Sequence, residues 1–411
     1  ITVEGGTVET SGTGGIAVSS HGNVLVQDTA EVSAIGANGF AISGKTITVE
    51  SGGTVSATGD NGTAISGRSI TVKDGATVSA TGTAIFSSDN VSVIGGLVNS
   101  NGSGIASQGN VSISGGTISA TGTAIFARGN VSISGGTISA NSTAISGVSV
   151  TVEGGTISAT DAAISSVDSV LVNNTAKDTA TGANGIAISG RFITVKGGTV
   201  EAIGPNGNAI SSRGNVSIIG GTISATGTAI SGDSVTVEEG KVEATGDNGK
   251  AISGKSTITI KGGTVSANGN NGTVIYVENY MGSTITISGG VVSSKGTAIY
   301  SSNRKGTSAI TVEGGLVFGR GSKIANNNIR DYNVAIYMTS GTPAVNSPGT
   351  VIAWNKTAGN KLYGLNADTD LTSLPESTAK WSRADGKSGI SYGTDGFLEI
   401  DGISVAEITA S

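Results

Sequence analysis

The chain has 411 residues, of which 68 are glycine and only 13% carry a charge. The formal net charge is −6, and lysine and arginine are scattered along the sequence, which argues against nucleic-acid binding. No apolar run reaches the roughly 20 residues that a transmembrane helix needs. The lack of cysteine excludes disulfides and thiolate metal sites.

One phrase, Ile-Thr-Val-Glu-Gly-Gly-Thr-Val, opens the chain at Ile1 and recurs with small changes, for example from Ile47, Ile193 and Ile310. The copies follow one another at a period of about 22 residues, which is the signature of a solenoid. Parallel crossovers are nearly always right-handed. The sequence therefore predicts an all-β fold, a right-handed parallel β-helix (β-solenoid) of about 15 coils of 19–27 residues.

Residues 47–68 illustrate one coil. Ile47 and Val49 alternate with polar residues, so they are expected to point inward from a first strand. A glycine pair then turns the chain into a second strand over 54–58, and a further corner leads to a third strand over 64–67. Stacked coils should pair in register and form a narrow core of valine and isoleucine.

The corner between the second and third strands is predicted to carry a ridge, because the longer coils all gain three residues there. Asn90, Asn110 and Asn130 lie one short coil apart and should stack as an amide ladder beside the first strand. The inserted segments are 37–39, 60–62, 183–185, 205–207, 247–249 and 270–272.

The two ends of the chain differ from its middle. Residues 1–315 form the repetitive β-helix, whereas 316–411 are expected to hold the last irregular coils and a C-terminal cap, with Trp354 and Trp381 in the cap core. Ile1 already lies within a repeat, and a bare strand edge is normally covered. We therefore expect a cap or further domain upstream of Ile1.

Charged residues form a thin file just after the first strand, which is typical of a solvated edge with occasional ion pairs. Polysaccharide lyases and hydrolases need clustered acids and bases instead, so such an enzyme is the minor alternative. His21 lies in a corner and is interpreted as a loop residue. The file comprises Glu4, Glu50, Lys73, Glu153, Lys196, Glu238, Lys261 and Glu313.

Two other ligands are weighed against ordinary turns and strands. The corners at 60–62 and 247–249 offer oxygens to calcium, yet no calcium-binding motif accompanies them, so we predict no metal and no cofactor. Outward threonine files suggest ice binding, but serine, alanine and glutamate interrupt them, and exposed strands favour threonine in any case.

Aromatic residues give the candidate ligand-binding site. Phe86 and Phe126 follow inward isoleucines and should face outward in one column, with Ala106 between them. Two rungs span about 9–10 Å, which suits two rings flanking a sugar chain. Tyr276 and Tyr300 stand in the same phase further along the chain. The competing interpretation is that these are ordinary exposed aromatics covering a seam.

The repeat at Val131 (Val-Ser-Ile-Ser-Gly-Gly-Thr-Ile-Ser-Ala) and the tail phrases at Gly349 (Gly-Thr-Val-Ile-Ala-Trp-Asn-Lys) and Gly389 (Gly-Ile-Ser-Tyr) carry a family resemblance. The chain resembles secreted bacterial parallel β-helix proteins of the carbohydrate-binding-domain-containing or adhesin-like type. This resemblance implies an extracellular or cell-surface location in a bacterium and a binding role without catalysis. Some relatives hold calcium in the helix, but the carboxylate cluster for that ion is not evident here.

The sequence thus favours an extracellular, non-catalytic binding or adhesion protein that recognises a polysaccharide or cell-surface glycan, with a host surface component as another possible partner. Shallow contacts along the solvent-facing strands would provide the binding. The alternatives are a structural stalk that presents another domain and a polysaccharide lyase or hydrolase.

Overall fold

The computed structural model describes residues 1–319 except 280 and 304, together with 336–338, 343–346, 349–353, 390–392, 398–400 and 403–404. All regular elements in these residues are strands. The chain forms two compact units, unit 1 (Ile1–Arg191) and unit 2 (Phe192–Ser411). Within each unit, parallel strands stack as a β-solenoid, as the periodicity predicted.

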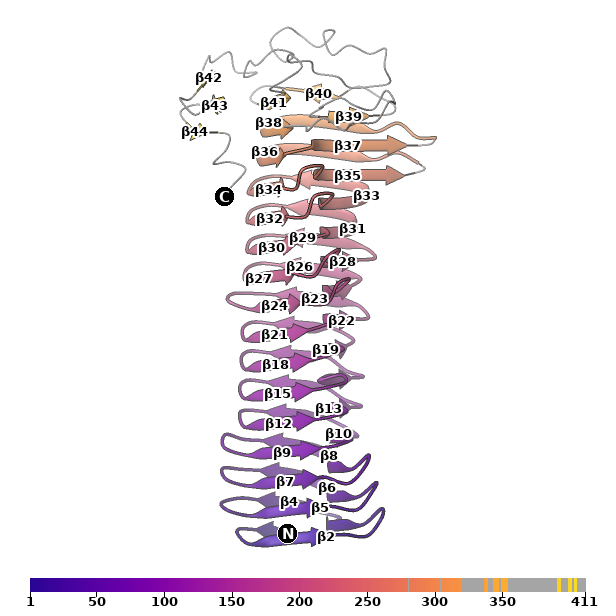
Figure 1. Cartoon of the computed structure of the whole chain (residues 1–411), viewed down its shortest axis with the longest axis vertical. Helices are drawn as coiled ribbons and strands as arrows, with labels where there is room; N and C mark the ends of the chain where they lie inside the picture. The colour runs from indigo at the N-terminus through magenta and orange to yellow at the C-terminus, as the bar shows by residue number, and fades with distance from the viewer. Residues whose placement is uncertain are drawn as a thin grey trace. The chain divides into compact units, whose positions relative to one another are not determined.

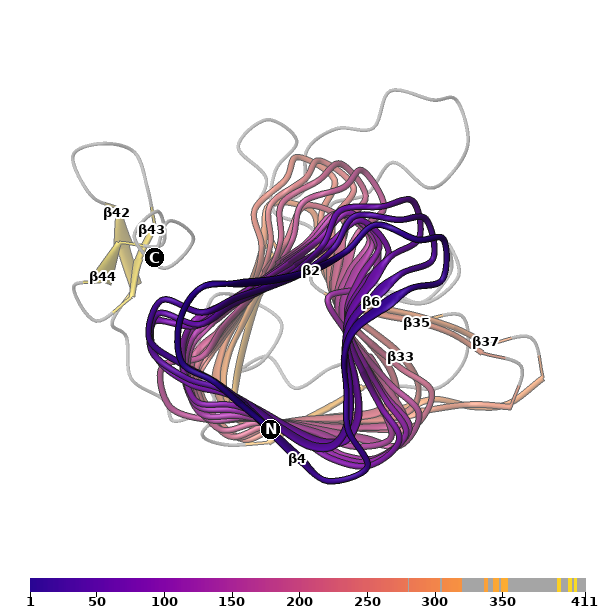
Figure 2. The ribbon, with the colours of Figure 1, turned by 90° about the horizontal axis from the view of Figure 1, so that it is seen from below.

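Unit 1 is built from coils with three strands and three corners (Figures 1 and 2). The first strands are β1 (Thr2–Val3), β4 (Asn23–Val26), β11 (Val91–Val93), β14 (Val111–Ile113), β17 (Val131–Ile133), β20 (Val150–Val152) and β23 (Ser169–Val172). The second strands are β2 (Thr7–Thr10), β5 (Glu31–Ala34), β7 (Thr54–Ala57), β9 (Thr77–Ala80), β12 (Leu97–Ser100), β15 (Thr117–Ala120), β18 (Thr137–Ala140), β21 (Thr156–Ala159) and β24 (Lys177–Ala180). The third strands are β3 (Ile16–Ser19), β10 (Thr83–Ser87), β13 (Ser103–Ser107), β16 (Ile125–Ala127), β19 (Thr143–Gly147), β22 (Ala162–Ser166) and β25 (Ile186–Gly190). In β6 (Phe40–Val49) and β8 (Thr63–Val72) the third strand of one coil continues into the first strand of the next.

Unit 2 repeats this plan with longer continuous strands. Its separate strands are β26 (Phe192–Val195), β27 (Thr199–Ala202), β28 (Asn208–Ser212), β29 (Asn215–Ile218), β30 (Thr222–Ala225), β32 (Lys241–Ala244), β34 (Thr264–Ala267), β35 (Thr273–Asn279) and β37 (Thr297–Asn303). The strands that run through a corner are β31 (Thr228–Val237), β33 (Lys250–Ile260), β36 (Thr284–Ser294) and β38 (Ala309–Gly319).

Further strands lie beyond β38 in the described part of unit 2. β39 (Ile336–Met338), β40 (Ala344–Val345) and β41 (Thr350–Ala353) pair in parallel with β37 and β38 and continue the coil pattern. β42 (Ile390–Tyr392), β43 (Leu398–Ile400) and β44 (Ile403–Ser404) form a small antiparallel sheet. The proposed cap core at Trp354 and Trp381 lies outside the described residues.

The winding is right-handed, as expected. In Figure 1 the near-side strands β5, β7 and β9 run from left to right while the chain climbs, and Figure 2 shows the matching clockwise course away from the viewer. About 14 turns are present, compared with the predicted 15 coils.

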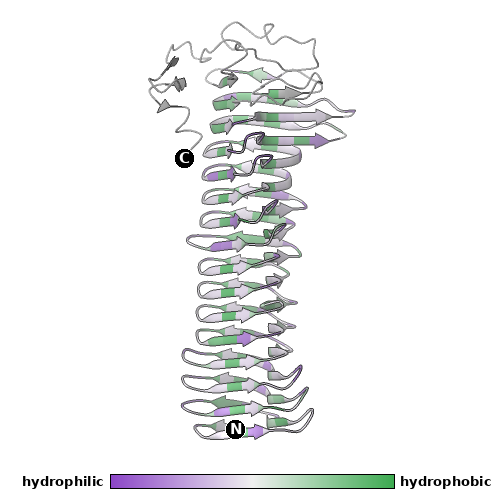
Figure 3. Ribbon diagram, in the orientation of Figure 1, coloured by the Kyte–Doolittle hydropathy of each residue, from purple (hydrophilic) through white to green (hydrophobic). Residues whose placement is uncertain are grey.

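The core forms because equivalent strands of successive coils pair in register. Apolar residues at inward positions stack on their equivalents, and Figure 3 shows them as green bands across successive strands. Burying each such side chain stabilises the fold by about 1.5–3 kcal/mol. One file, with every member fully buried, is Val55, Val78, Val98, Ile118, Ile138 and Ile157.

Candidate functional site

Two exposed phenylalanines share one column on the third-strand face of unit 1. Phe86 of β10 pairs in register with Ala106 of β13, which pairs with Phe126 of β16. The phenylalanine side chains are 40% and 42% exposed, whereas the preceding isoleucines are fully buried. The predicted column is therefore confirmed. The two rings lie two rungs apart, with Ala106 on the rung between them. Because the alanine side chain is small, it leaves the space between the rings unfilled.

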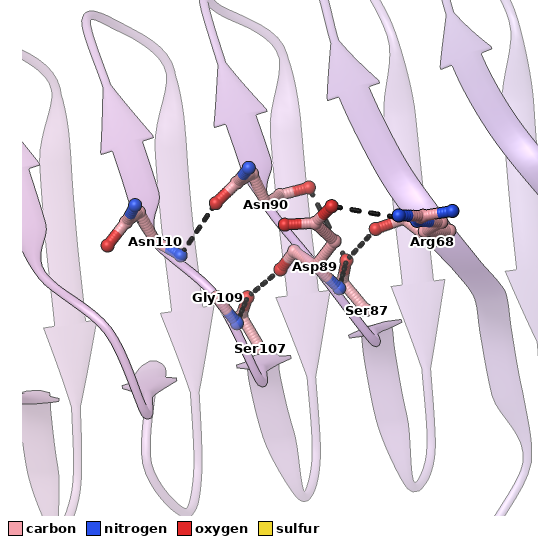
Figure 4. Close-up of polar contacts among 7 residues, drawn as sticks. All are labelled: Arg68, Ser87, Asp89, Asn90, Ser107, Gly109 and Asn110. Carbon is pink, nitrogen blue, oxygen red and sulfur yellow. Dashed lines mark hydrogen bonds and ion pairs between the residues drawn. The ribbon is translucent and has the colours of Figure 1, made fainter.

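A polar corner joins this face to the first strands (Figure 4). Buried Ser87 closes β10, and its hydroxyl donates to the Arg68 carbonyl of the neighbouring coil at 2.8 Å. Ser107 repeats the arrangement and donates to the Asp89 carbonyl at 2.5 Å. Each serine oxygen also accepts a backbone N–H from its own corner. These bonds hold successive corners directly above one another.

The asparagine ladder also lies at this corner. The Asn110 N–H donates to Oδ1 of Asn90 at 2.8 Å, and the Asn130 N–H donates to Oδ1 of Asn110 at 2.8 Å. The predicted stacking is confirmed, but each rung joins a side chain to the backbone, whereas the prediction placed side-chain amides against one another. The ladder uses the amide oxygens, so the Nδ2 groups of Asn90 and Asn110 do not take part in it (Figure 4).

A shallow, open depression adjoins the ladder on the first-strand face. It lies where the corner lengthens, because two residues connect Gly67 to Ile70 whereas three connect Ser87 to Val91. Six of its eight lining residues carry a hydroxyl or amide group, the usual hydrogen-bonding partners of sugar hydroxyls, although most of its exposed surface is apolar. The lining residues are Ser69, Ile70, Thr71, Asn90, Val91, Ser92, Asn110 and Ser112.

Basic side chains of unit 1 concentrate at the same corner, which we call the basic corner (Lys45, Arg68, Arg128 and Arg191, all exposed). The full set of lysines and arginines in residues 1–191 is Lys45, Arg68, Lys73, Arg128, Lys177 and Arg191, so four of the six lie there. Arg68 forms an exposed ion pair with Asp89 at 3.6 Å. Such pairs contribute little to stability, so this one leaves the arginine able to exchange partners. The linear sequence hides this clustering because each of the four residues is separated from the next by 23 to 63 positions.

The corner between the first and second strands carries the predicted charge file. In unit 1 Lys73 pairs with Glu50, and the Gln27 amide donates to Glu4 at 3.1 Å. In unit 2 Lys261 pairs with Glu238 at 3.0 Å. These contacts confirm an edge with occasional ion pairs.

The inserted three-residue segments all lie at the second-to-third corner of their own unit, as predicted. The segment at 60–62 forms a tight turn, and its equivalents do the same. In this turn the Gly62 N–H donates to the Gly59 carbonyl at 2.9 Å, and Asn61 has a φ of 53°. Within the part of the chain that the structure describes, no three histidine, cysteine or acidic residues gather as a metal-binding group.

Tyr276 of β35 and Tyr300 of β37 form a stacked pair in unit 2. Their ring centroids are 5.1 Å apart and their planes differ by 4°. Nζ of Lys250 lies 3.4 Å from the centroid of the Tyr276 ring, and the Tyr276 hydroxyl donates to Glu278 at 2.6 Å. That hydrogen bond, with burial, raises the pKa of Tyr276 to about 12, and burial lowers the pKa of Lys250.

This stacking changes the interpretation of the tyrosines. Atoms in contact lie about 3.5–4 Å apart, so rings at 5.1 Å leave no space for a sugar between them. The pair is therefore not the sandwich that the spacing of Phe86 and Phe126 permits. The sequence correctly placed the two tyrosines in one column, but it gave no indication of Lys250 or Glu278. Lys250 belongs to the neighbouring strand β33, and Glu278 lies near the end of β35, the strand that carries Tyr276.

Sequence comparison finds no match to a protein-family model, a curated protein or a solved structure. In the described ranges no helix has the length and apolar character to cross a membrane. Function is therefore inferred from the arrangement of residues in this chain.

Proposed function

We propose that this chain is a non-catalytic binding protein, located outside the cell or on its surface, that recognises an extended glycan carrying negative charges. The binding surface runs along the basic corner of unit 1 and the adjoining phenylalanine column. The main support for this proposal is that four of the six basic residues of unit 1 lie along the same edge as its exposed phenylalanine pair.

The chemistry of this edge suits a charged polysaccharide. Aromatic rings contact the apolar faces of sugars, while hydroxyl and amide groups bond to sugar hydroxyls. Arginine binds carboxylate or sulfate groups through paired N–H donors. Coils repeat at about 4.8 Å, so a stack of them offers a linear polymer a series of similar contacts. Many weak contacts of this kind add up to useful affinity.

The test is binding of the purified full chain to a panel of neutral and acidic polysaccharides. The double variant Phe86→Ala/Phe126→Ala should weaken binding of an acidic polysaccharide by about five- to 150-fold, if each ring contributes the about 0.5–1.5 kcal/mol typical of aromatic contacts. Arg68→Ala/Arg128→Ala should weaken it as well and reduce its dependence on salt. Ile94→Ala/Leu97→Ala is the matched control, because these side chains are 46% and 39% exposed at another corner.

Four results would contradict all or part of the proposal. If no polysaccharide binds, the chain is better explained as a stalk. If binding occurs but is unchanged in both double variants, the site lies elsewhere. Release of shortened oligosaccharides during incubation would identify an enzyme. Equal binding of neutral and acidic polymers would overturn the assignment of charge while leaving glycan recognition in place.

A further inference from the structure

The stacked tyrosines of unit 2 combine three features that favour oxidation chemistry. The rings lie face to face, a carboxylate accepts the hydroxyl hydrogen bond of one of them, and both side chains are partly exposed. We propose that Tyr276 and Tyr300 are a site of oxidative cross-linking, at which a one-electron oxidant joins the two rings into a dityrosine that staples one coil to the next. This inference is independent of the glycan-binding proposal.

The geometry brings the reacting carbons together. Strand register pairs Tyr276 directly with Tyr300, and the two rings are nearly parallel with their centroids 5.1 Å apart. The two rings that the reaction would join are therefore already side by side. Rotation of the side chains about χ1 and χ2 can close the remaining gap while the backbone pairing is kept. Proximity of this kind strongly favours an internal link over one between separate chains.

Glu278 is placed to take the proton that Tyr276 releases on oxidation. A phenol that loses an electron near neutral pH must also lose its proton, and the Glu278 carboxylate at 2.6 Å is placed to accept it. The Lys250 ammonium over the ring disfavours a positively charged ring, so electron loss without proton loss is costly there. Glu278 thus directs oxidation toward the neutral phenoxyl radical, while Lys250 raises the cost of the radical cation.

The chemical balance is simple. Each tyrosine gives one electron to the oxidant and releases its phenolic proton. The two phenoxyl radicals form one carbon–carbon bond between their ortho positions, and the hydrogen on each of those carbons then moves to its oxygen and restores the aromatic ring. The product has lost two hydrogen atoms, and the two electrons reduce two equivalents of a one-electron oxidant, or one molecule of hydrogen peroxide to two of water when a peroxidase delivers the oxidation in two one-electron steps.

The experiment treats the full chain with peroxidase and hydrogen peroxide and follows dityrosine by fluorescence and by mass spectrometry of proteolytic peptides. We expect a linked peptide containing Tyr276 and Tyr300, lighter by two hydrogens, in monomeric protein. Tyr276→Phe and Tyr300→Phe should each abolish this peptide while keeping the stacked rings. Glu278→Gln should slow its formation by about tenfold or more, because the proton acceptor is weakened.

Tyr337 is the matched control, since its backbone is in register with Tyr300 on the next coil. Tyr337→Phe should leave the Tyr276–Tyr300 peptide unchanged. The proposal is wrong if dityrosine forms only between separate chains, if it joins other tyrosines instead, or if none forms in folded protein that the same oxidant modifies elsewhere. Unchanged circular dichroism of the three phenylalanine variants establishes that a lost signal reflects lost chemistry.

Discussion

Replacing Asp178 with valine is expected to stabilise the protein by several kcal/mol at pH 7. Asp178 lies in β24 at an inward position, directly opposite Ile157 of β21, and its side chain is fully buried. Neither carboxyl oxygen has a hydrogen-bond partner among the described residues. Burying an unpaired polar group is unfavourable, and valine would restore the aliphatic file. Urea titration of the full chain measures the change in the free energy of unfolding.

The same residue makes stability depend on pH with a predictable sign. Burial raises the pKa of Asp178 from 3.8 to about 8 in the folded chain. Between these values the unfolded chain releases a proton that the folded chain keeps, so the free energy of unfolding falls as pH rises, by at most about 1.4 kcal/mol per pH unit. From pH 4 to pH 7 the loss amounts to about 4 kcal/mol.

Asp178→Asn separates the two effects, because asparagine keeps the buried polarity but cannot ionise. Its stability relative to the original chain should increase steadily from pH 4 to pH 7, and valine should exceed it by a constant amount. Asp161→Asn, at an exposed position, provides the control and should change little. A difference between Asp178→Asn and the original chain that does not vary with pH would contradict the buried, neutral carboxyl.

Replacing Gly116 with alanine is expected to destabilise the protein by about 3 kcal/mol or more. Gly116 precedes β15 with a φ of +81°, which already costs a side chain about 1 kcal/mol. A Cβ at this position would also lie 2.5 Å from the Gly96 carbonyl oxygen of the neighbouring coil. The backbone cannot move aside without breaking the register of the stack, so the clash adds to the conformational cost.

Gly6 gives a closely matched control. It precedes the second strand of the first coil with a φ of +72°, and a Cβ there would have no atom within 4 Å. Gly6→Ala should therefore cost only the conformational term, about 1 kcal/mol. Equal melting temperatures for the two variants would show that the turn alone, and not the contact between coils, selects glycine at this corner.

The repetition made the fold predictable. Alternation in segments such as 47–49 identifies the inward residues, and a constant period requires that equivalent residues lie above one another. The outward column of Phe86 and Phe126 follows from the same two facts. Buried Asp178 was missed, although the segment 177–180 reads Lys-Asp-Thr-Ala where the two preceding coils read Thr-Ile-Ser-Ala. Aligning the repeats column by column would have revealed it.

Other features depend on geometry that the repeat period does not determine. The contacts of Ser87 and Ser107 with the carbonyls of the preceding corners depend on corner length and on the depth of each side chain. The Lys250 contact with Tyr276 depends on how far β33 and β35 extend beside one another. The basic corner arises only when residues from distant repeats are brought to one edge.

The register of unit 1 also determines how it would respond to mechanical load. Its parallel strands lie across the stacking direction, so tension applied along the stack would act on the bonds of one coil at a time. Each coil that peels away would release about 20 residues, or roughly 65–70 Å of extended chain. Unit 1 would therefore lengthen in a series of nearly equal steps.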